Sequence, residues 1–135
     1  MLFRSIYPGD GVKLLPYIPT ASLAAVLVTF PDPFPGEKQK QWRVIQTQTV
    51  LEIHRILRKS STGLFFLATD HEGYNEWSHM VMETVNAKNK YFECRAPCPD
   101  RAEWMPAISR YEQKGWDEGR RTNLSCWLAL PVSDD

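Results

Sequence analysis

The chain has 135 residues, 43% of them hydrophobic, and this size and composition predict one globular domain. Sixteen basic and sixteen acidic residues cancel, so the net charge gives no support for a nucleic-acid partner, which would have to be argued from local clusters. Three cysteines without disulfide-type spacing, and no apolar run of about 20 residues, predict a soluble intracellular protein, cytoplasmic or nuclear, with no membrane partner.

The first predicted element is the continuous apolar run 23–30, LAAVLVTF. A short run of this kind fits a strand buried on both faces, as in a parallel sheet. Prolines at 31, 33 and 35 end the strand, because proline has no N–H to donate to a ladder. From about Gln46 to Arg58 the apolar period becomes that of an amphipathic helix. Its stripe follows i, i+3, i+4 and i+7 and is widened by two further residues: Val50, Ile53, His54, Leu57, Leu51 and Ile56.

A second strand and helix follow the first pair. Residues 64–69, LFFLAT, predict another buried strand that ends at Asp70. The next helix has one buried face, and Thr69 or Asp70 is suited to cap its start. That face comprises Tyr74, Trp77, Ser78, Val81 and Val85. Strand, helix, strand, helix is the order of right-handed βαβ units with parallel strands.

The pattern loosens in the last third of the chain. Residues 91–95 predict a short strand, 96–106 a proline-containing excursion, and 105–121 a loop. Residues 124–132 are apolar enough for a final strand, which we expect to be antiparallel and to lie at the end of the sheet. The chain is therefore predicted to be a single α/β domain over residues 1–135.

Two aspartates follow the two apolar strands. Asp32 comes after the first strand and Asp70 directly after the second. Because ligands of open α/β sheets bind outside the carboxyl ends of the strands, we expect both side chains at a binding edge. Each also has a plainer interpretation, with Asp32 as a turn residue between prolines and Asp70 as a helix cap.

Residues 38–59 contain six cations and a single acid, Glu52. The cations are Lys38, Lys40, Arg43, Arg55, Arg58 and Lys59. A local cluster of this kind fits a phosphate backbone. A solvated helix face explains it equally well.

Three segments in a fixed order resemble the signatures of one enzyme family. They are Phe30–Pro35 (FPDPFP), Leu67–Trp77 (LATDHEGYNEW) and Ser109–Gly115 (SRYEQKG). They resemble the FPDPW-type, ATD-x-x-x-Y-x-x-W and T-K-F-E-x-x-G motifs of the tRNA (guanine-N7-)-methyltransferases, in matching order and spacing. The resemblance implies the C-terminal part of a Rossmann-like class I methyltransferase sheet. It also implies S-adenosylmethionine as methyl donor and tRNA as partner.

The same resemblance implies roles for particular residues. Asp32 matches the catalytic aspartate, which also contacts the cofactor, and Asp10 matches an acidic cofactor-binding position. Asp70 matches a substrate-binding aspartate. The other substrate-binding matches are Ser109, Arg110, Tyr111, Glu112, Lys38, Lys40 and Arg43. Phe34 or Trp42 could stack on an unstacked base.

Two departures separate the chain from the family pattern. The glycine-rich cofactor loop is not found, since Gly9-Asp-Gly11 has no strand, turn and helix around it. Gly36, Gln39 and Trp42 dilute the basic stretch. Two functions therefore stay open: a tRNA (guanine-N7-)-methyltransferase, or a truncated, non-catalytic remnant that binds RNA or a partner protein. Half of a doubly wound sheet also leaves a strand edge unpaired, which predicts a homodimer or a missing N-terminal segment.

Overall fold

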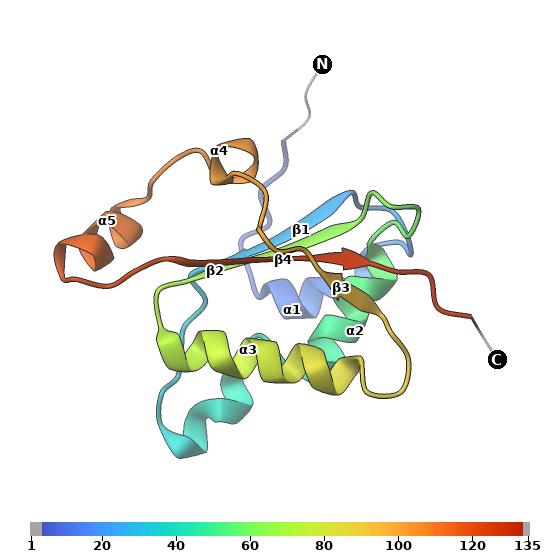
Figure 1. Ribbon diagram of the computed structural model, residues 1–135, viewed down its shortest axis with the longest axis horizontal. Coiled ribbons are helices and arrows are strands. Elements are labelled where there is room, and N and C mark those ends of the chain that lie inside the picture. The colour runs from blue at the N-terminus through green and yellow to red at the C-terminus, as the bar shows by residue number, and fades with distance from the viewer. Residues whose placement is uncertain (1–3, 134–135) are drawn as a thin grey trace.

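The computed structural model describes residues 4–133 and contains one four-stranded sheet (Figure 1). The strand order is β1-β2-β4-β3. β1 (Ala25–Thr29) runs parallel to β2 (Leu64–Thr69), and β4 (Asn123–Ala129) pairs antiparallel with both β2 and β3 (Phe92–Cys94). The predicted α/β class, the parallel pair and the antiparallel last strand are therefore confirmed.

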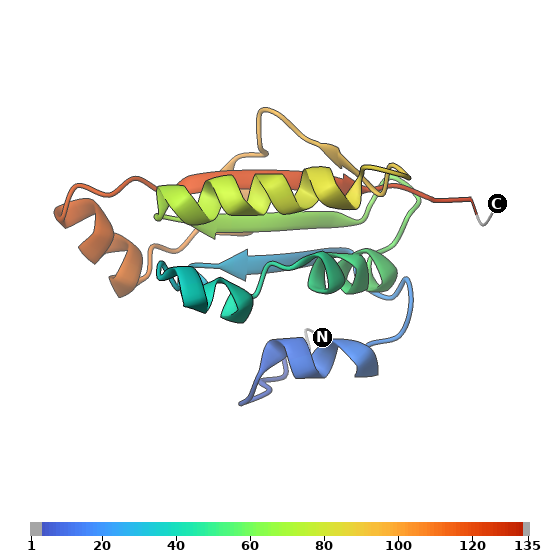
Figure 2. The same cartoon turned by 90° about the horizontal axis from the view of Figure 1, so that it is seen from below.

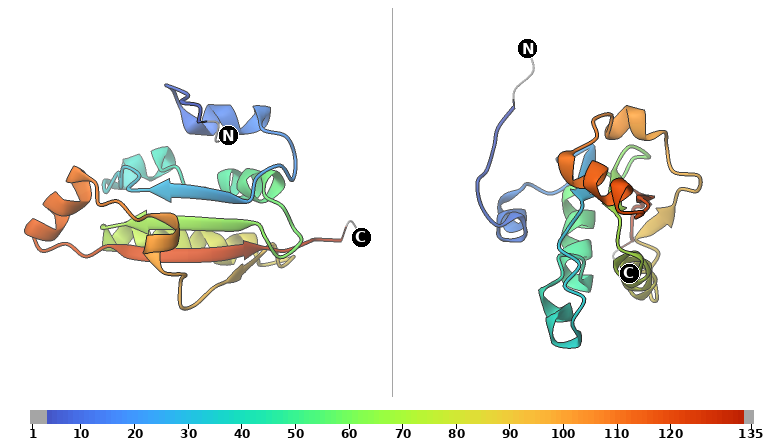
Figure 3. Two further views of the ribbon diagram at one scale, coloured as in Figure 1. Left: turned by 90° about the horizontal axis from the view of Figure 1, so that it is seen from above. Right: turned by 90° about the vertical axis from the view of Figure 1, so that its left-hand side faces the viewer.

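Two helices cover one face of this sheet. α2 (Thr47–Ile56) and α3 (Glu72–Val85) lie side by side below the strands in Figure 1, and the right-hand view of Figure 3 shows α3 end-on beside α2. Their buried residues form the core with side chains of β2 and β4: Val50, Ile53, Tyr74, Val81, Phe65, Leu67 and Trp127. None of the helices within residues 4–133 has the length and apolar character needed to cross a bilayer.

The remaining helical segments are short. They are α1 (Gly11–Leu14), η1 (Leu15–Tyr17), η2 (Glu37–Trp42), α4 (Arg101–Trp104) and α5 (Arg110–Asp117). α1 lies beside β1, beyond the edge of the sheet, whereas α4 lies over the face opposite α2 and α3 (Figures 2 and 3).

β1 is less buried than its apolar sequence predicts. Val26 and Val28 pack against the core, but alternate residues on the other face are exposed, and Leu27 is 41% exposed. The prediction of burial on both faces is wrong for this strand, because β1 is the edge of the sheet. On the same face Trp104 of α4 covers Phe66 of β2, with stacked rings 4.3 Å apart, and leaves Leu27 open.

Two predictions about the last third of the chain are also corrected. β4 lies between β2 and β3, so the final strand is interior and β3 forms the second edge. The segment expected to be a loop, 105–121, contains the two-turn helix α5. Its end is marked by Gly119, whose positive φ of 86° favours glycine.

The start of α3 is capped by a residue other than the two predicted. His71 is the N-cap, and its Nδ1 accepts a hydrogen bond from the Tyr74 N–H at 3.0 Å. Thr69 accepts instead from the His71 N–H at 3.2 Å. Asp70, just before the cap, is therefore available for other contacts.

The apolar stripe predicted for α2 is confirmed except at Leu51, which is 36% exposed. His54 is buried, and its Nε2 lies 2.7 Å from the Leu130 carbonyl oxygen. Burial lowers the pKa of His54, which fits the predicted role of a core histidine with a satisfied ring nitrogen.

Candidate active site at the carboxyl edge of the parallel strands

The turn after β1 presents Asp32 at the end of the sheet. β1 and β2 point toward the end of the molecule where η2 and α5 lie (Figure 2). The Asp32 Oδ1 accepts a hydrogen bond from the Phe34 N–H at 3.0 Å, and the aspartate is exposed. Phe30 and Phe34 adopt positive φ values of 50° and 39°, which are uncommon outside glycine. Backbone conformations of this kind cluster at functional sites.

Arg43 fastens this turn to the core. Its Nε donates to the Pro33 carbonyl oxygen at 2.9 Å. The guanidinium carbon lies 5.5 Å from the ring centre of Tyr74 and 5.0 Å from that of Trp77. Arg43 is only 6% exposed, so the contacts described give it a structural role in shaping the turn that carries Asp32.

The other residues predicted in the basic stretch lie on η2. Lys38 is exposed, and the Lys40 Nζ lies 3.0 Å from a Glu37 carboxylate oxygen. Trp42 is 56% exposed, with its ring edge-on to Phe34 at 5.9 Å. An exposed aromatic beside lysines suits contact with a nucleic acid.

The six cations do not form one patch. Arg55 is at the far end of α2, away from η2, and pairs with Glu52 at 3.1 Å (Figure 2). Lys59 donates to the Leu57 carbonyl at 2.5 Å, and burial lowers its pKa. The interpretation of residues 38–59 as a single phosphate-binding cluster is therefore wrong, because α2 separates its two ends.

Asp70 is held at the end of β2. Its side chain is 7% exposed, and its Oδ2 accepts a hydrogen bond from the Arg120 Nε at 3.0 Å. Its Oδ1 accepts a long hydrogen bond from the Tyr111 hydroxyl at 3.5 Å. Gly115 of α5 packs so closely that a Cβ there would stand 2.7 Å from the Asp70 Oδ2.

Tyr111 contacts residues at the ends of both parallel strands. Its ring lies 5.5 Å from the ring of Phe30, at the end of β1, and the residue is 49% exposed. Partial burial raises the pKa of Tyr111, and the carboxylates of Asp70 and Asp32 raise it further. Because β1 and β2 are parallel neighbours, their carboxyl ends and the aspartates that follow them lie at one rim of the sheet, as predicted from the sequence.

α5 is anchored by a buried carboxylate. Ser109 caps the helix by accepting from the Glu112 N–H at 3.1 Å. The Glu112 side chain is 1% exposed and receives two hydrogen bonds from Arg101, at 2.6 and 2.8 Å, and one from the Thr122 hydroxyl at 2.6 Å. These contacts position the helix, while Arg110 and Tyr111 face solvent. The S-x-x-E pattern is a capping-box signal from which the helix could have been predicted.

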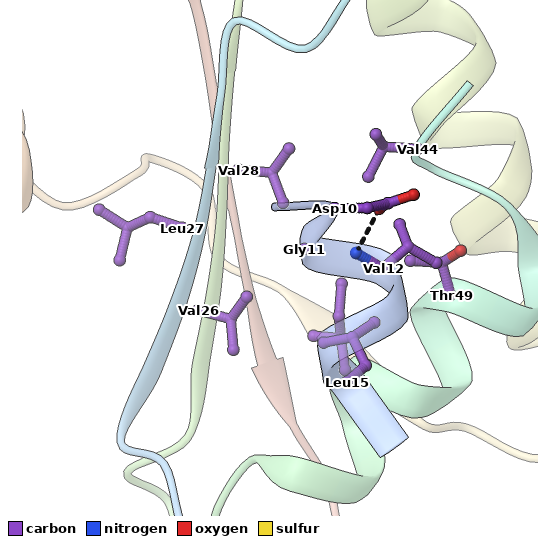
Figure 4. Close-up of a pocket in the computed structure, with 10 residues that line it drawn as sticks. Asp10, Gly11, Val12, Leu15, Val26, Leu27, Val28, Val44 and Thr49 are labelled. Carbon is purple, nitrogen blue, oxygen red and sulfur yellow. Dashed lines mark hydrogen bonds between the residues drawn. The ribbon is translucent and has the colours of Figure 1, made fainter. Parts of the chain in front are cut away.

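Asp10 lies apart from this group, on the rim of a cavity of about 230 Å³ beside β1 (Figure 4). Its Oδ1 accepts from the Val12 N–H at 2.9 Å, so Asp10 caps α1. The rest of the lining is mainly apolar and includes Val26, Val28 and Val44. Figure 4 shows Asp10 next to Val28 and Val44.

A parallel strand pair whose carboxyl ends carry two aspartates is the arrangement of an α/β enzyme that binds its ligand at that edge. Residues 5–124 match the family described as "Putative methyltransferase", and the chain belongs to that family.

The chain is also similar to curated proteins named tRNA (guanine-N(7)-)-methyltransferase. It is 32% identical to that of Jannaschia sp. over 117 residues, covering 86% of this chain and 47% of the relative. It is 31% identical to that of Rhodopseudomonas palustris over 130 residues (87% and 43%) and 32% identical to that of Corynebacterium diphtheriae over 123 residues (88% and 45%). The chain thus spans slightly less than half the length of these relatives, and the family resemblance predicted from three segments is confirmed.

Proposed function

We propose that this chain takes part in transferring a methyl group from S-adenosylmethionine to N7 of a guanine in tRNA. The observation that carries the proposal is the position of Asp32 and Asp70 after neighbouring parallel strands on one rim of the sheet, where Tyr111 contacts both Asp70 and Phe30. The names of the relatives supply the substrate class.

The proposed reaction makes electrostatic demands on the protein rather than a demand for a base. N7 of guanine has a lone pair and no proton, so the N7–C bond forms as the C–S bond breaks. Positive charge moves from the sulfonium to the base, and the sulfur leaves as a neutral thioether. No proton has to be removed. A carboxylate close to the base offsets the developing charge, and fixed orientation supplies much of the remaining rate enhancement.

The residues at the rim divide this work. Asp32, exposed on a turn fixed by Arg43, is proposed to offset the charge on the methylated base and to contact the donor. Asp70 is proposed to accept hydrogen bonds from the N1–H and N2–H₂ edge of guanine, which adenine does not present. Tyr111, whose hydroxyl lies next to the Asp70 carboxylate, is proposed to contact the edge of the base that Asp70 binds.

The outer residues are proposed to contact the rest of the tRNA. Lys38, Lys40 and Arg110 would meet phosphates, and Trp42 offers a platform for a base. Ser109, Glu112 and Arg43 would contribute by holding α5 and the turn in place.

We propose that the cavity beside β1 takes part of the methyl donor. Its walls are apolar, and Asp10 adds one carboxylate, a lining that suits an apolar group carrying a hydroxyl or a cation. We therefore propose Asp10 as the residue that contacts the donor from this side.

The test is a methyl-transfer assay on unmodified tRNA with the 135-residue chain and methyl-labelled S-adenosylmethionine. Digestion and mass spectrometry of the nucleosides should give labelled 7-methylguanosine. Transfer to another nucleoside would overturn the proposed specificity. Binding of tRNA without any transfer would instead support the non-catalytic RNA-binding alternative.

β1 pairs with a neighbouring strand on one side only, and this leads to a separate prediction about partners. An exposed apolar edge strand invites association, so we expect the chain to form a homodimer through β1 at micromolar concentration. Leu27→Lys should shift the sedimentation coefficient toward that of the monomer, because a charged side chain on an edge strand disfavours its association with another chain. Met80→Lys, at an apolar residue of α3 that is 50% exposed, is the matched control. A wild-type chain that sediments as a monomer at these concentrations would contradict the prediction.

A further inference from the structure

Arg120 lies behind Asp70 and was not among the residues that the sequence pointed to. Fifty positions separate the two residues along the chain, and the Arg120 Nε donates to the Asp70 Oδ2 at 3.0 Å. The guanidinium also pairs, through its Nη1, with the carboxylate of Glu118. Hydrogen bonds to Asp70 and to Glu118 raise the pKa of Arg120. Arg120 is thus fixed between two acids, only one of which lies at the candidate site.

The packing of α5 leaves Asp70 little freedom on its Oδ2 side. A Cβ at Gly115 would stand 2.7 Å from the Asp70 Oδ2 and 3.4 Å from the Arg120 Nε, so only glycine permits this approach. The Arg120 N–H donates to the Gly115 carbonyl at 2.8 Å, which ties the backbone of Arg120 to the same helix end.

The Oδ1 side of Asp70 is different. There the hydroxyl of Tyr111 lies 3.5 Å away, at the long limit of a hydrogen bond, on a side chain that is half exposed. One oxygen of the carboxylate is therefore committed to a charged donor, whereas the other accepts, among residues 4–133, a single long hydrogen bond from Tyr111. A short aspartate side chain held in this way can present one oxygen in a fixed direction.

We propose that Arg120 is a positioning residue for guanine recognition, which holds the Asp70 carboxylate so that its Oδ1 accepts from the N1–H and N2–H₂ edge of the base. The inference rests on the proposed function. Arg120 itself does not contact the base in this proposal. Its effect passes through the direction of one carboxylate, so it should alter the choice of base and not the binding of the methyl donor.

The test compares guanosine with inosine at the methylated position of one tRNA transcript. Inosine lacks the 2-amino group, so the wild type should prefer guanosine about tenfold in kcat/KM, the value of one hydrogen bond to a charged acceptor. Arg120→Gln should lower kcat/KM for the guanosine transcript about tenfold, mainly through KM. It should also reduce the guanosine preference to about twofold, because a mobile Asp70 no longer distinguishes the 2-amino group. KM for S-adenosylmethionine should stay unchanged.

Two further variants separate positioning from a merely structural role. Arg121→Gln removes the exposed neighbouring cation and should keep the wild-type preference. Glu118→Gln releases the outer side of the Arg120 guanidinium and should weaken the preference by an intermediate factor, even if Arg120→Gln folds poorly.

The outcomes distinguish this inference from the proposed function. If the wild type methylates guanosine, and both Arg120→Gln and Glu118→Gln keep the wild-type preference for guanosine over inosine, the inference is overturned and the proposed function is not. A wild-type chain that methylates no guanosine overturns both.

Discussion

Asp32→Asn is expected to reduce methyl transfer to guanine about 100-fold, the size of effect seen when one electrostatic partner of a transition state is removed. In the structure, this substitution changes the charge of residue 32 and can leave its hydrogen bond in place. The Asp32 Oδ1 accepts from the Phe34 N–H, and the asparagine Oδ1 can accept the same hydrogen bond. The turn should therefore persist while the negative charge is lost. Single-turnover rates on unmodified tRNA measure the chemical step apart from binding.

A matched control for Asp32→Asn is available at the start of α4, away from the end of the sheet that carries Asp32. Asp100 is also exposed and caps a short helix, its Oδ1 accepting from the Ala102 N–H at 3.1 Å. Asp100→Asn should leave the single-turnover rate within about twofold, because it removes the same charge from the same kind of turn outside the site. Equal rates for Asp32→Asn and the wild type would exclude Asp32 from the proposed chemistry.

The main strands and helices could be predicted from local pattern. β2 begins and ends at the predicted residues, and α2 and α3 bury the predicted faces. Strand order is not encoded in such patterns. The apolar run of β1 has the composition of a buried strand, yet its exposure at Leu27 depends on which neighbours the strand has. The interior position of β4 could not be predicted for the same reason.

The site was predictable where it depends on strand ends and not where it depends on distant partners. Asp32 and Asp70 follow from the ends of β1 and β2. Arg120 reaches Asp70 across 50 residues, and no local feature of its sequence points to that contact. α5 was missed because few of its residues are apolar and only Glu112 and Gly115 are buried. A helix that is held by a buried ion pair does not show the periodic pattern of apolar residues from which helices are predicted.

Arg43 and Glu112 are buried charged residues that support the site through their contacts. The resemblance pointed to both as substrate-binding, and that role stays a prediction. Arg43 fixes the turn of Asp32, and Glu112 fixes the helix of Tyr111. Motif residues of a family can be required at a site because they shape it, and the described contacts favour that explanation for this pair.

Glu112→Gln is expected to lower the free energy of unfolding by about 3 kcal/mol at pH 7, the lower end for removing one partner of a buried ion pair. The carboxylate is buried, and its loss leaves Arg101 without its charged acceptor and weakens the bond from Thr122. Urea denaturation of the wild type and the variant measures the difference. Glu103→Gln, at an exposed residue of α4, should change stability by less than about 0.5 kcal/mol.

The effect of Glu112→Gln should depend on pH in a fixed direction. Hydrogen bonding from Arg101 lowers the pKa of Glu112 in the folded chain below its value of about 4.3 in an unfolded one. A carboxyl group with a lowered folded pKa stabilises the protein above the unfolded pKa, and this stabilisation is lost as the pH falls through the folded value. The difference in free energy of unfolding between wild type and variant should therefore have its full size at pH 7. It should begin to decrease below about pH 4.3 and decrease further as the pH falls. A difference that is the same size at pH 7 and pH 3 would mean that loss of the negative charge is not what destabilises the variant.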